Sequence, residues 1–219
     1  QSGTDVCIAP VENDKAELYA PQDCSRFLDN LNTSLGKSLK SIRCSSLNTS
    51  NVTNMEFMFN NCSSLTELNV SSFDTSNVTT MRYMFGGCSG LSALDVSMFD
   101  TSKVTNMAYM FFKCRGLKSL DLSSFKTSEV TSMGHMFQEC SGLTSLDVSM
   151  FDTAMVKTMQ SMFSNCSGLI TLDLSKLDTS NVTTTANMFR DCSSLTELNL
   201  KNFNTSNVTI MDAMFRGCS

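Results

Sequence analysis

A cysteine recurs every 26 residues through most of this chain, and this period constrains the fold more than any other feature. The seven positions are Cys62, Cys88, Cys114, Cys140, Cys166, Cys192 and Cys218. Self-similarity with a period of roughly 20 to 50 residues is the signature of a solenoid, in which each unit contacts mainly its neighbours. The sequence therefore predicts a stack of about seven coils over residues 39–219.

Aligned by this period, the units share apolar columns: a valine, then methionine, a Met-Phe pair, the cysteine and a series of leucines. Leu65, Leu68 and Val70 follow the L-x-x-L-x-L spacing of a leucine-rich-repeat strand. The Met-x-x-Met-Phe-x-x-Cys segment has apolar residues three and four apart, which favours one or two helical turns. We therefore predict an α/β solenoid, a right-handed leucine-rich-repeat-like stack with short parallel strands and short helical turns.

Residues 1–38 do not fit the repeat, and they contain both prolines and two unmatched cysteines. We interpret them as an N-terminal cap, because the exposed end of a solenoid core must be covered. Small irregular caps gain most from a covalent tie, so we predict a disulfide between Cys7 and Cys24. The sequence stops halfway through a unit, which predicts an open C-terminal end.

Charge and residue pattern exclude several classes of function. The net charge is −5 and no column of Lys or Arg exists to neutralise phosphates, so nucleic acid is not an expected partner. No apolar run approaches the length of a membrane span. The repeat cysteines share one column and lack the close pairs of a zinc site, so we predict small buried hydrophobes and no metal. Serines and acids recur identically on every coil, so neither a catalytic site nor a cofactor is predicted.

Two polar columns leave alternatives open. The first carries acids or amides between inward strand positions, at Asn69, Asp95, Asp121, Asp147, Asp173 and Asn199. Stacked carboxylates repel, so either calcium bridges them or each accepts hydrogen bonds from the neighbouring coil, which we favour. The second holds the threonines Thr49, Thr75, Thr101, Thr127, Thr153, Thr179 and Thr205. An ice-binding face is the weaker interpretation of these threonines, because the parallel column is interrupted by Lys157.

One variable column carries rings on four consecutive coils, at Phe57, Tyr83, Tyr109 and His135. It then continues with Ser161, Asn187 and Ala213. If the column is exposed, the rings form a contiguous patch suited to a protein partner or to sugar stacking. The alternative is that the rings half-cover the core of the convex face. Both interpretations remain open at this point.

Several Asn-x-Ser/Thr sequons occur, because a repeat built from Asn, Ser and Thr generates them automatically. Glycosylation takes place only in a secretory pathway that performs it. The candidate acceptors that share one turn column are Asn51, Asn77, Asn181 and Asn207.

The repeat units themselves carry a resemblance. Residues 75–89, Thr-Ser-Asn-Val-Thr-Thr-Met-Arg-Tyr-Met-Phe-Gly-Gly-Cys-Ser, and residues 143–153, Leu-Thr-Ser-Leu-Asp-Val-Ser-Met-Phe-Asp-Thr, are typical units. They resemble the BspA-type leucine-rich-repeat surface proteins, and more closely the branch found in mycoplasma lipoproteins as a family of unknown function. The resemblance covers about residues 39–219. It implies an extracellular or cell-surface protein used in adhesion, without enzyme activity.

The leading hypothesis is therefore a non-catalytic recognition module that binds a protein or glycan on another cell or in the matrix. The competing hypothesis is structural: the uncapped coil stacks on another subunit and builds an extracellular fibre or sheath. An enzyme is the least supported class.

Overall fold

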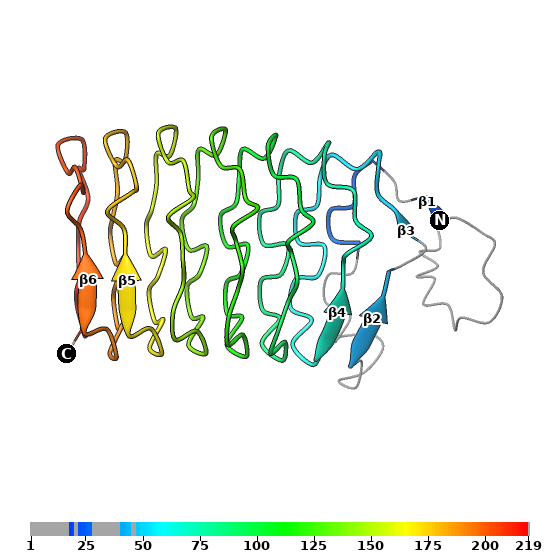
Figure 1. Cartoon of the computed structure of the whole chain (residues 1–219), viewed down its shortest axis with the longest axis horizontal. Helices are drawn as coiled ribbons and strands as arrows, with labels where there is room; N and C mark the ends of the chain where they lie inside the picture. Colours follow the sequence, from blue (N-terminus) through cyan, green and yellow to red (C-terminus); the bar gives the residue numbers. More distant parts are fainter. Residues whose placement is uncertain (1–17, 20–21, 28–39, 45–46, 219) are drawn as a thin grey trace.

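The computed structural model describes residues 18–19, 22–27, 40–44 and 47–218. Its coils stack one after another along the long axis of the molecule, from the N-terminal to the C-terminal end (Figure 1). One parallel bridge between each pair of neighbouring coils continues from Asp23↔Asn54 to Thr184↔Ile210. The predicted repeat solenoid is confirmed, whereas its handedness and number of coils stay predictions.

The strands are short and pair near the two ends of the stack (Figure 1). All three pairs are parallel: β1 (Leu18–Tyr19) with β3 (Leu47–Asn48), β2 (Ser41–Arg43) with β4 (Glu67–Asn69), and β5 (Thr171–Asp173) with β6 (Glu197–Asn199). The corresponding segments 93–95, 119–121 and 145–147 are not strands. Their inward leucines, Leu94, Leu120 and Leu146, are nevertheless only 7–8 % exposed. The leucine pattern thus predicts the burial of these side chains correctly, but it predicts a hydrogen-bonded strand correctly on only some of the coils.

The prediction of helical turns is wrong, because none of the described residues is helical. The Met-Phe segment instead folds as successive tight turns. The N–H of Met58 donates to the carbonyl of Met55 (3.3 Å), and Phe57 between them has φ 57°. A backbone with φ near +60° cannot continue a right-handed helix. The apolar spacing of three and four therefore marks repeated turns rather than a helix.

Between these turns, alternate N–H groups leave the coil and bond to the next one. The N–H of Phe57 donates to the carbonyl of Arg82 (3.0 Å), and the N–H of Phe59 donates to the carbonyl of Met84 (2.9 Å). The same pattern recurs on the following coils. It fixes the register, so equivalent side chains lie directly above one another.

Columns of identical side chains fill the core. Neighbouring rings of the core stack lie 5.7–5.9 Å apart, in the series Phe59, Phe85, Phe111, Phe137, Phe163 and Phe189. The repeat cysteines up to Cys192 are buried as predicted. The Cys88 thiol donates to the carbonyl of Phe59 (3.1 Å), and the later cysteines do the same one coil on. Burial holds the pKa of the Cys114 thiol well above its usual value, so this column is chemically quiet.

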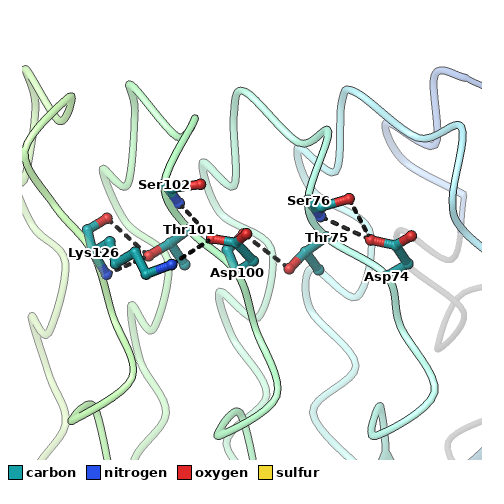
Figure 2. Close-up of polar contacts among 7 residues, drawn as sticks. All are labelled: Asp74, Thr75, Ser76, Asp100, Thr101, Ser102 and Lys126. Atoms are coloured by element: carbon teal, nitrogen blue, oxygen red, sulfur yellow. Dashed lines mark hydrogen bonds and ion pairs between the residues drawn. The ribbon is translucent and has the colours of Figure 1, made fainter.

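The threonine column is a buried ladder of hydrogen bonds between coils. The hydroxyl of Thr75 donates to the carbonyl of Asp100 (3.0 Å), and that of Thr101 donates to the carbonyl of Lys126 (2.9 Å) (Figure 2). From Thr49 to Thr179 these threonines are at most 2 % exposed. The ice-binding interpretation is therefore wrong, because this face does not reach water.

The strand aspartates Asp95, Asp121, Asp147 and Asp173 each accept the N–H of the serine two residues later in their own coil, and Asp173 has a further side-chain hydrogen bond with Asn199 of the next coil. Asp95 accepts both the N–H (3.0 Å) and the hydroxyl (2.7 Å) of Ser97, two residues later in its own coil. These bonds lower the pKa of Asp95 below its ordinary value. Within the part of the chain that the structure describes, no three His, Cys, Asp or Glu side chains converge to hold a metal ion. Each of these carboxylates thus has a hydrogen-bond donor within its own coil.

The last coil exposes apolar side chains, Ile210, Met211 and Phe215, because no further coil of this sequence covers them. At the other end, residues 22–27 already follow the geometry of the stack: the N–H of Cys24 donates to the carbonyl of Asn54 (2.9 Å). Most of the predicted cap over 1–38 lies outside the described residues, so this boundary stays a prediction.

Candidate ligand-binding site

The four rings of the variable column share one backbone conformation. Phe57, Tyr83, Tyr109 and His135 have φ between 56° and 61°, each as the third residue of a tight turn. Their N–H groups all donate to the next coil, at 2.8–3.1 Å. This double anchoring places the rings at one position on successive coils.

The rings stack face to face along the solenoid axis. The centroids of Phe57 and Tyr83 are 4.9 Å apart, and the Tyr83–Tyr109 and Tyr109–His135 pairs are each 4.2 Å apart. The planes differ by only 6–10°. We call this set of four side chains the aromatic ladder. All four residues are half-buried.

Stacking between the rings offsets part of the free-energy cost of their left-handed backbone conformation. A left-handed conformation costs a residue other than glycine about 1–2 kcal/mol. A stacked aromatic pair contributes about 0.5–1.5 kcal/mol beyond its burial. Ser161, Asn187 and Ala213 continue the column with φ of 52–56° but have no rings. The backbone geometry thus belongs to the repeat, while the ladder belongs to these four coils.

Two further side chains border the ladder. The guanidinium of Arg82 lies 4.9 Å from the Tyr83 centroid, 5.2 Å from that of Phe57 and 5.9 Å from that of Tyr109. Phe112 meets Tyr83 and Tyr109 edge-on, at 6.0 and 5.6 Å. Cation–π contacts of this length hold a guanidinium in place. The site is therefore an aromatic stack with a fixed cation beside it.

Arg26 extends the column at its N-terminal end. Its φ of 59° and its N–H bond to the carbonyl of Glu56 (2.9 Å) match those of the ladder residues one coil later. Its guanidinium lies 4.7 Å from the Phe57 centroid. A cation therefore covers the first ring face of the ladder.

Tyr83 and His135 are neutral near pH 7. Burial, with Tyr109 alongside, raises the pKa of Tyr83 to about 12, so its hydroxyl keeps its proton. Burial lowers the pKa of His135, although its hydrogen bond to Gln138 acts in the opposite direction. The His135 Nδ1 lies 2.7 Å from the Gln138 amide oxygen, which only accepts, so Nδ1 carries the proton. The ladder thus offers neutral polar atoms at its edge.

Stacking limits what the ladder can bind. A sugar stacks on the open face of a ring, but the inner faces here lie against one another and the first is covered by Arg26. What remains for a ligand is the row of ring edges, the tyrosine hydroxyls, the Arg82 guanidinium and the second face of His135, whose next neighbour in the column is Ser161 and not a ring. The geometry favours a partner that presents polar and apolar groups along the axis over one that inserts a flat sugar.

Sequence reasoning singled out the four rings but missed Arg82, Phe112 and Arg26. Arg82 and Phe112 stand in columns that hold unrelated residues on other coils, so no period marks them. Arg26 precedes the 26-residue register by an irregular spacing. The signal available was the Arg-Tyr dipeptide at 82–83, a cation next to a ring.

The other predicted site residues lie elsewhere. Cys24 is buried and its pKa is raised by burial to about 11, while Cys7 lies outside the described residues, so their disulfide stays a prediction. The candidate glycosylation residues Asn51, Asn77, Asn181 and Asn207 are all exposed. The amide groups of the last three donate to the preceding coil, at 2.6–2.9 Å. Their modification also stays a prediction.

Coil geometry and core columns define the class of protein as a repeat solenoid of the leucine-rich-repeat type. The family profile described as "Mycoplasma protein of unknown function, DUF285" matches residues 23–145 and 137–219. The chain belongs to this family, which confirms the resemblance seen in its repeat units. No curated protein matches the sequence. The described residues contain no helix of the length and apolarity needed to span a membrane.

Several solved bacterial structures are similar to this chain over much of its length. The T. pallidum leucine-rich-repeat protein TpLRR is 17 % identical, with 82 % of this chain and 71 % of that chain covered and a TM-score of 0.37. A leucine-rich-repeat protein from Eubacterium ventriosum is 20 % identical, with coverage of 79 % and 58 % and a TM-score of 0.42. A leucine rich cell surface protein from Faecalibacterium prausnitzii is 18 % identical, with coverage of 88 % and 46 % and a TM-score of 0.37. The chain therefore spans less than two thirds of the second and third proteins.

Proposed function

We propose that the protein is a non-catalytic recognition module, displayed outside the cell or on its surface, that binds a macromolecular partner, a protein or a glycan, through the aromatic ladder. The observation that carries this proposal is the ladder itself. It is a half-buried stack of rings on a surface column that is otherwise occupied by small or polar residues.

General physics of repeat proteins supports a binding role. A solenoid presents an extended, rigid surface, and its binding site is found where side chains depart from the repeat. Aromatic side chains supply large contact areas at low cost in conformational entropy. The ladder adds rigidity, because each ring is held by its neighbours and by two backbone hydrogen bonds.

The test compares the wild-type chain with a double variant, Tyr83→Asn and Tyr109→Asn. Asparagine tolerates the left-handed backbone, and Asn187 already occupies this column with φ 56°. Both proteins are applied to an array of glycans and to a display library of random peptides. We expect ligands selected by the wild type to lose affinity for the double variant by about 10-fold or more, since aromatic anchors dominate binding energy.

The matched control is the double variant Met98→Ser and Met150→Ser. Both methionines are exposed, and Ser72 and Ser124 occupy their column on other coils. This control should keep the selected ligands. Equal binding by the tyrosine double variant, or loss of binding by the methionine control, would refute a ladder site.

Fibre formation through the last coil has no separate support. The exposed Ile210, Met211 and Phe215 follow from the absence of a covering coil in this sequence. Recognition through the ladder is therefore the one function proposed.

A further inference from the structure

Arg82, the cation beside the ladder, forms no ion pair with a carboxylate of the described residues. Among the described side chains, Arg82, Lys113 and Arg190 are the half-buried cations. Lys113 lies 3.7 Å from a carboxylate oxygen of Glu139, and Arg190 lies 3.1 Å from one of Asp191. For Arg82, no carboxylate of the described residues comes within the 4.0 Å of an ion pair. Of the three half-buried cations that the structure describes, Arg82 is thus the one without an ion pair to a described carboxylate.

The acid that shares the column of Arg82 on the preceding coil already accepts a hydrogen bond. Glu56 occupies the column of Arg82 on the preceding coil, and its carboxylate accepts the hydroxyl of Thr80 at 3.0 Å. On the following two coils the column holds Ala108 and Gly134, which carry no charge. Among the described residues, therefore, no carboxylate lies within ion-pair distance of Arg82.

The rings position this guanidinium for an anion. Its central carbon lies within 5.9 Å of three ring centroids, so its orientation is held by the ladder. Cation–π contact uses no N–H donor, and a guanidinium carries five donors in a fork that matches a carboxylate. Part of the desolvation cost of binding an anion has been met on folding, since Arg82 is half-buried.

We propose that Arg82 receives a side-chain carboxylate, an aspartate or glutamate, of a protein partner that lies along the aromatic ladder. A protein fits better than an acidic glycan because the faces between the rings, beside Arg82, are occupied by neighbouring rings and are closed to a stacked sugar. The ring edges meet apolar side chains next to the acid, and the hydroxyls of Tyr83 and Tyr109 supply polar contacts. This inference rests on the proposed function in one respect, that the ladder face is the binding face.

The test uses a display library of random 12-residue peptides, selected on the wild-type chain and then measured against Arg82→Gln and Arg82→Lys. We expect the selected peptides to share an Asp or Glu beside an apolar or aromatic residue. Losing a charge-assisted hydrogen-bonded pair should weaken binding by about 10- to 100-fold in Arg82→Gln. Arg82→Lys should recover part of the affinity, because it keeps the charge but not the fork. An uncharged mutant peptide, Asp→Asn or Glu→Gln, should weaken wild-type binding as much as Arg82→Gln does.

A second arm applies an array of uronate and sulfate glycans to the same proteins. Glycan binding that depends on Arg82 would overturn the assignment to a protein carboxylate. Peptides without an acid, or equal binding to Arg82→Gln, would also overturn it. If the tyrosine double variant loses binding while Arg82→Gln does not, the ladder function stands and this inference fails. If neither variant loses binding, or no peptide is enriched over the double variant, both proposals fail. A thermal melt of each Arg82 variant checks that the fold is intact.

Discussion

Thr101→Val tests whether buried threonine hydroxyls hold the coils together. The Thr101 hydroxyl donates to the carbonyl of Lys126 (2.9 Å) and accepts the N–H of the same residue (2.8 Å). Among the described residues, Thr75, one coil earlier, has a single side-chain hydrogen bond, which its hydroxyl donates to the carbonyl of Asp100 (3.0 Å); Figure 2 shows this bond. Valine has nearly the same shape but no hydroxyl. Thr101→Val therefore removes two hydrogen bonds, whereas Thr75→Val removes one from the equivalent buried site of the preceding coil.

Each buried backbone group left without a partner costs about 1–3 kcal/mol. Thr75→Val leaves one carbonyl without this hydrogen bond, so we expect a loss of about 1–2 kcal/mol in the free energy of unfolding. Thr101→Val leaves a carbonyl and an N–H without their hydrogen bonds, so we expect a loss of about 2–4 kcal/mol in the free energy of unfolding. Thr101→Ser keeps both bonds and loses one methyl group, which costs about 1 kcal/mol. Urea unfolding should give the smallest loss for Thr101→Ser, a larger one for Thr75→Val and the largest for Thr101→Val.

Hydrogen exchange gives the local measurement, which matters because a repeat array need not unfold in one step. In Thr101→Val the amide of Lys126 should lose its protection. The amide of Phe125, bonded to the carbonyl of Leu122 (3.0 Å) in the same coil, should keep its own. Equal unfolding free energies for the two valine variants, or an unchanged Lys126 amide, would refute the reasoning.

Three further predictions concern the left-handed backbone at Ala213, the loss of stability at low pH through Asp95, and the reactivity of the buried cysteines. Ala213→Gly should stabilise the fold by about 1 kcal/mol in urea unfolding, because Ala213 has φ 52°, whereas Ala186→Gly should destabilise it by about 0.5–1 kcal/mol. The Ser97 hydrogen bonds lower the pKa of Asp95, so their contribution is full above the ordinary value of 3.8 and disappears as pH falls through the lower folded-state pKa. Thermal melts from pH 6 to 2 should show this fall, and it should shrink in Asp95→Asn. A thiol reagent at pH 8 should leave Cys88, Cys114, Cys140 and Cys166 unmodified until urea is added, because burial raises the pKa of each well above its usual value. Rapid labelling of these four in the folded protein would contradict their burial.

The repeat period predicted which side chains form the core, but it did not predict the conformation of the backbone between them. On every coil before the last, the valine, methionine, phenylalanine and cysteine columns are buried as their period indicates, because the same contacts recur from coil to coil. The helical interpretation of the Met-Phe segment failed for a physical reason. Apolar spacing of three and four is also produced by tight turns whose third residue is left-handed, and the residues there, such as Tyr83 and His135, are not the glycines that signal such a turn. Inter-coil bonds impose that conformation, and a single unit does not reveal them.

The polar columns show a second limit. Asp95 and Thr101 look alike in the sequence as members of regular polar series, yet one is exposed and the other buried. Asp95 is satisfied within its own coil by Ser97, while Thr101 is satisfied only across coils. The period identifies a column but not the direction in which its side chain points. That direction decides between a surface for ligands and a bond that holds the stack together.

A partner can be bound at one position along the solenoid only through side chains that differ from coil to coil. A repeated group binds a neighbour equally well at every coil, so it cannot select one position on a partner. Arg82 occurs once, in a column that elsewhere holds Glu, Ala, Gly, Gln and Asp, and it lies beside a ladder that ends at His135. Together they give the solenoid one distinct place along its axis. A partner aligned by the ring edges would be fixed in register by a single carboxylate at Arg82, because a shift by one coil would place that charge beside Ala108 or Glu56.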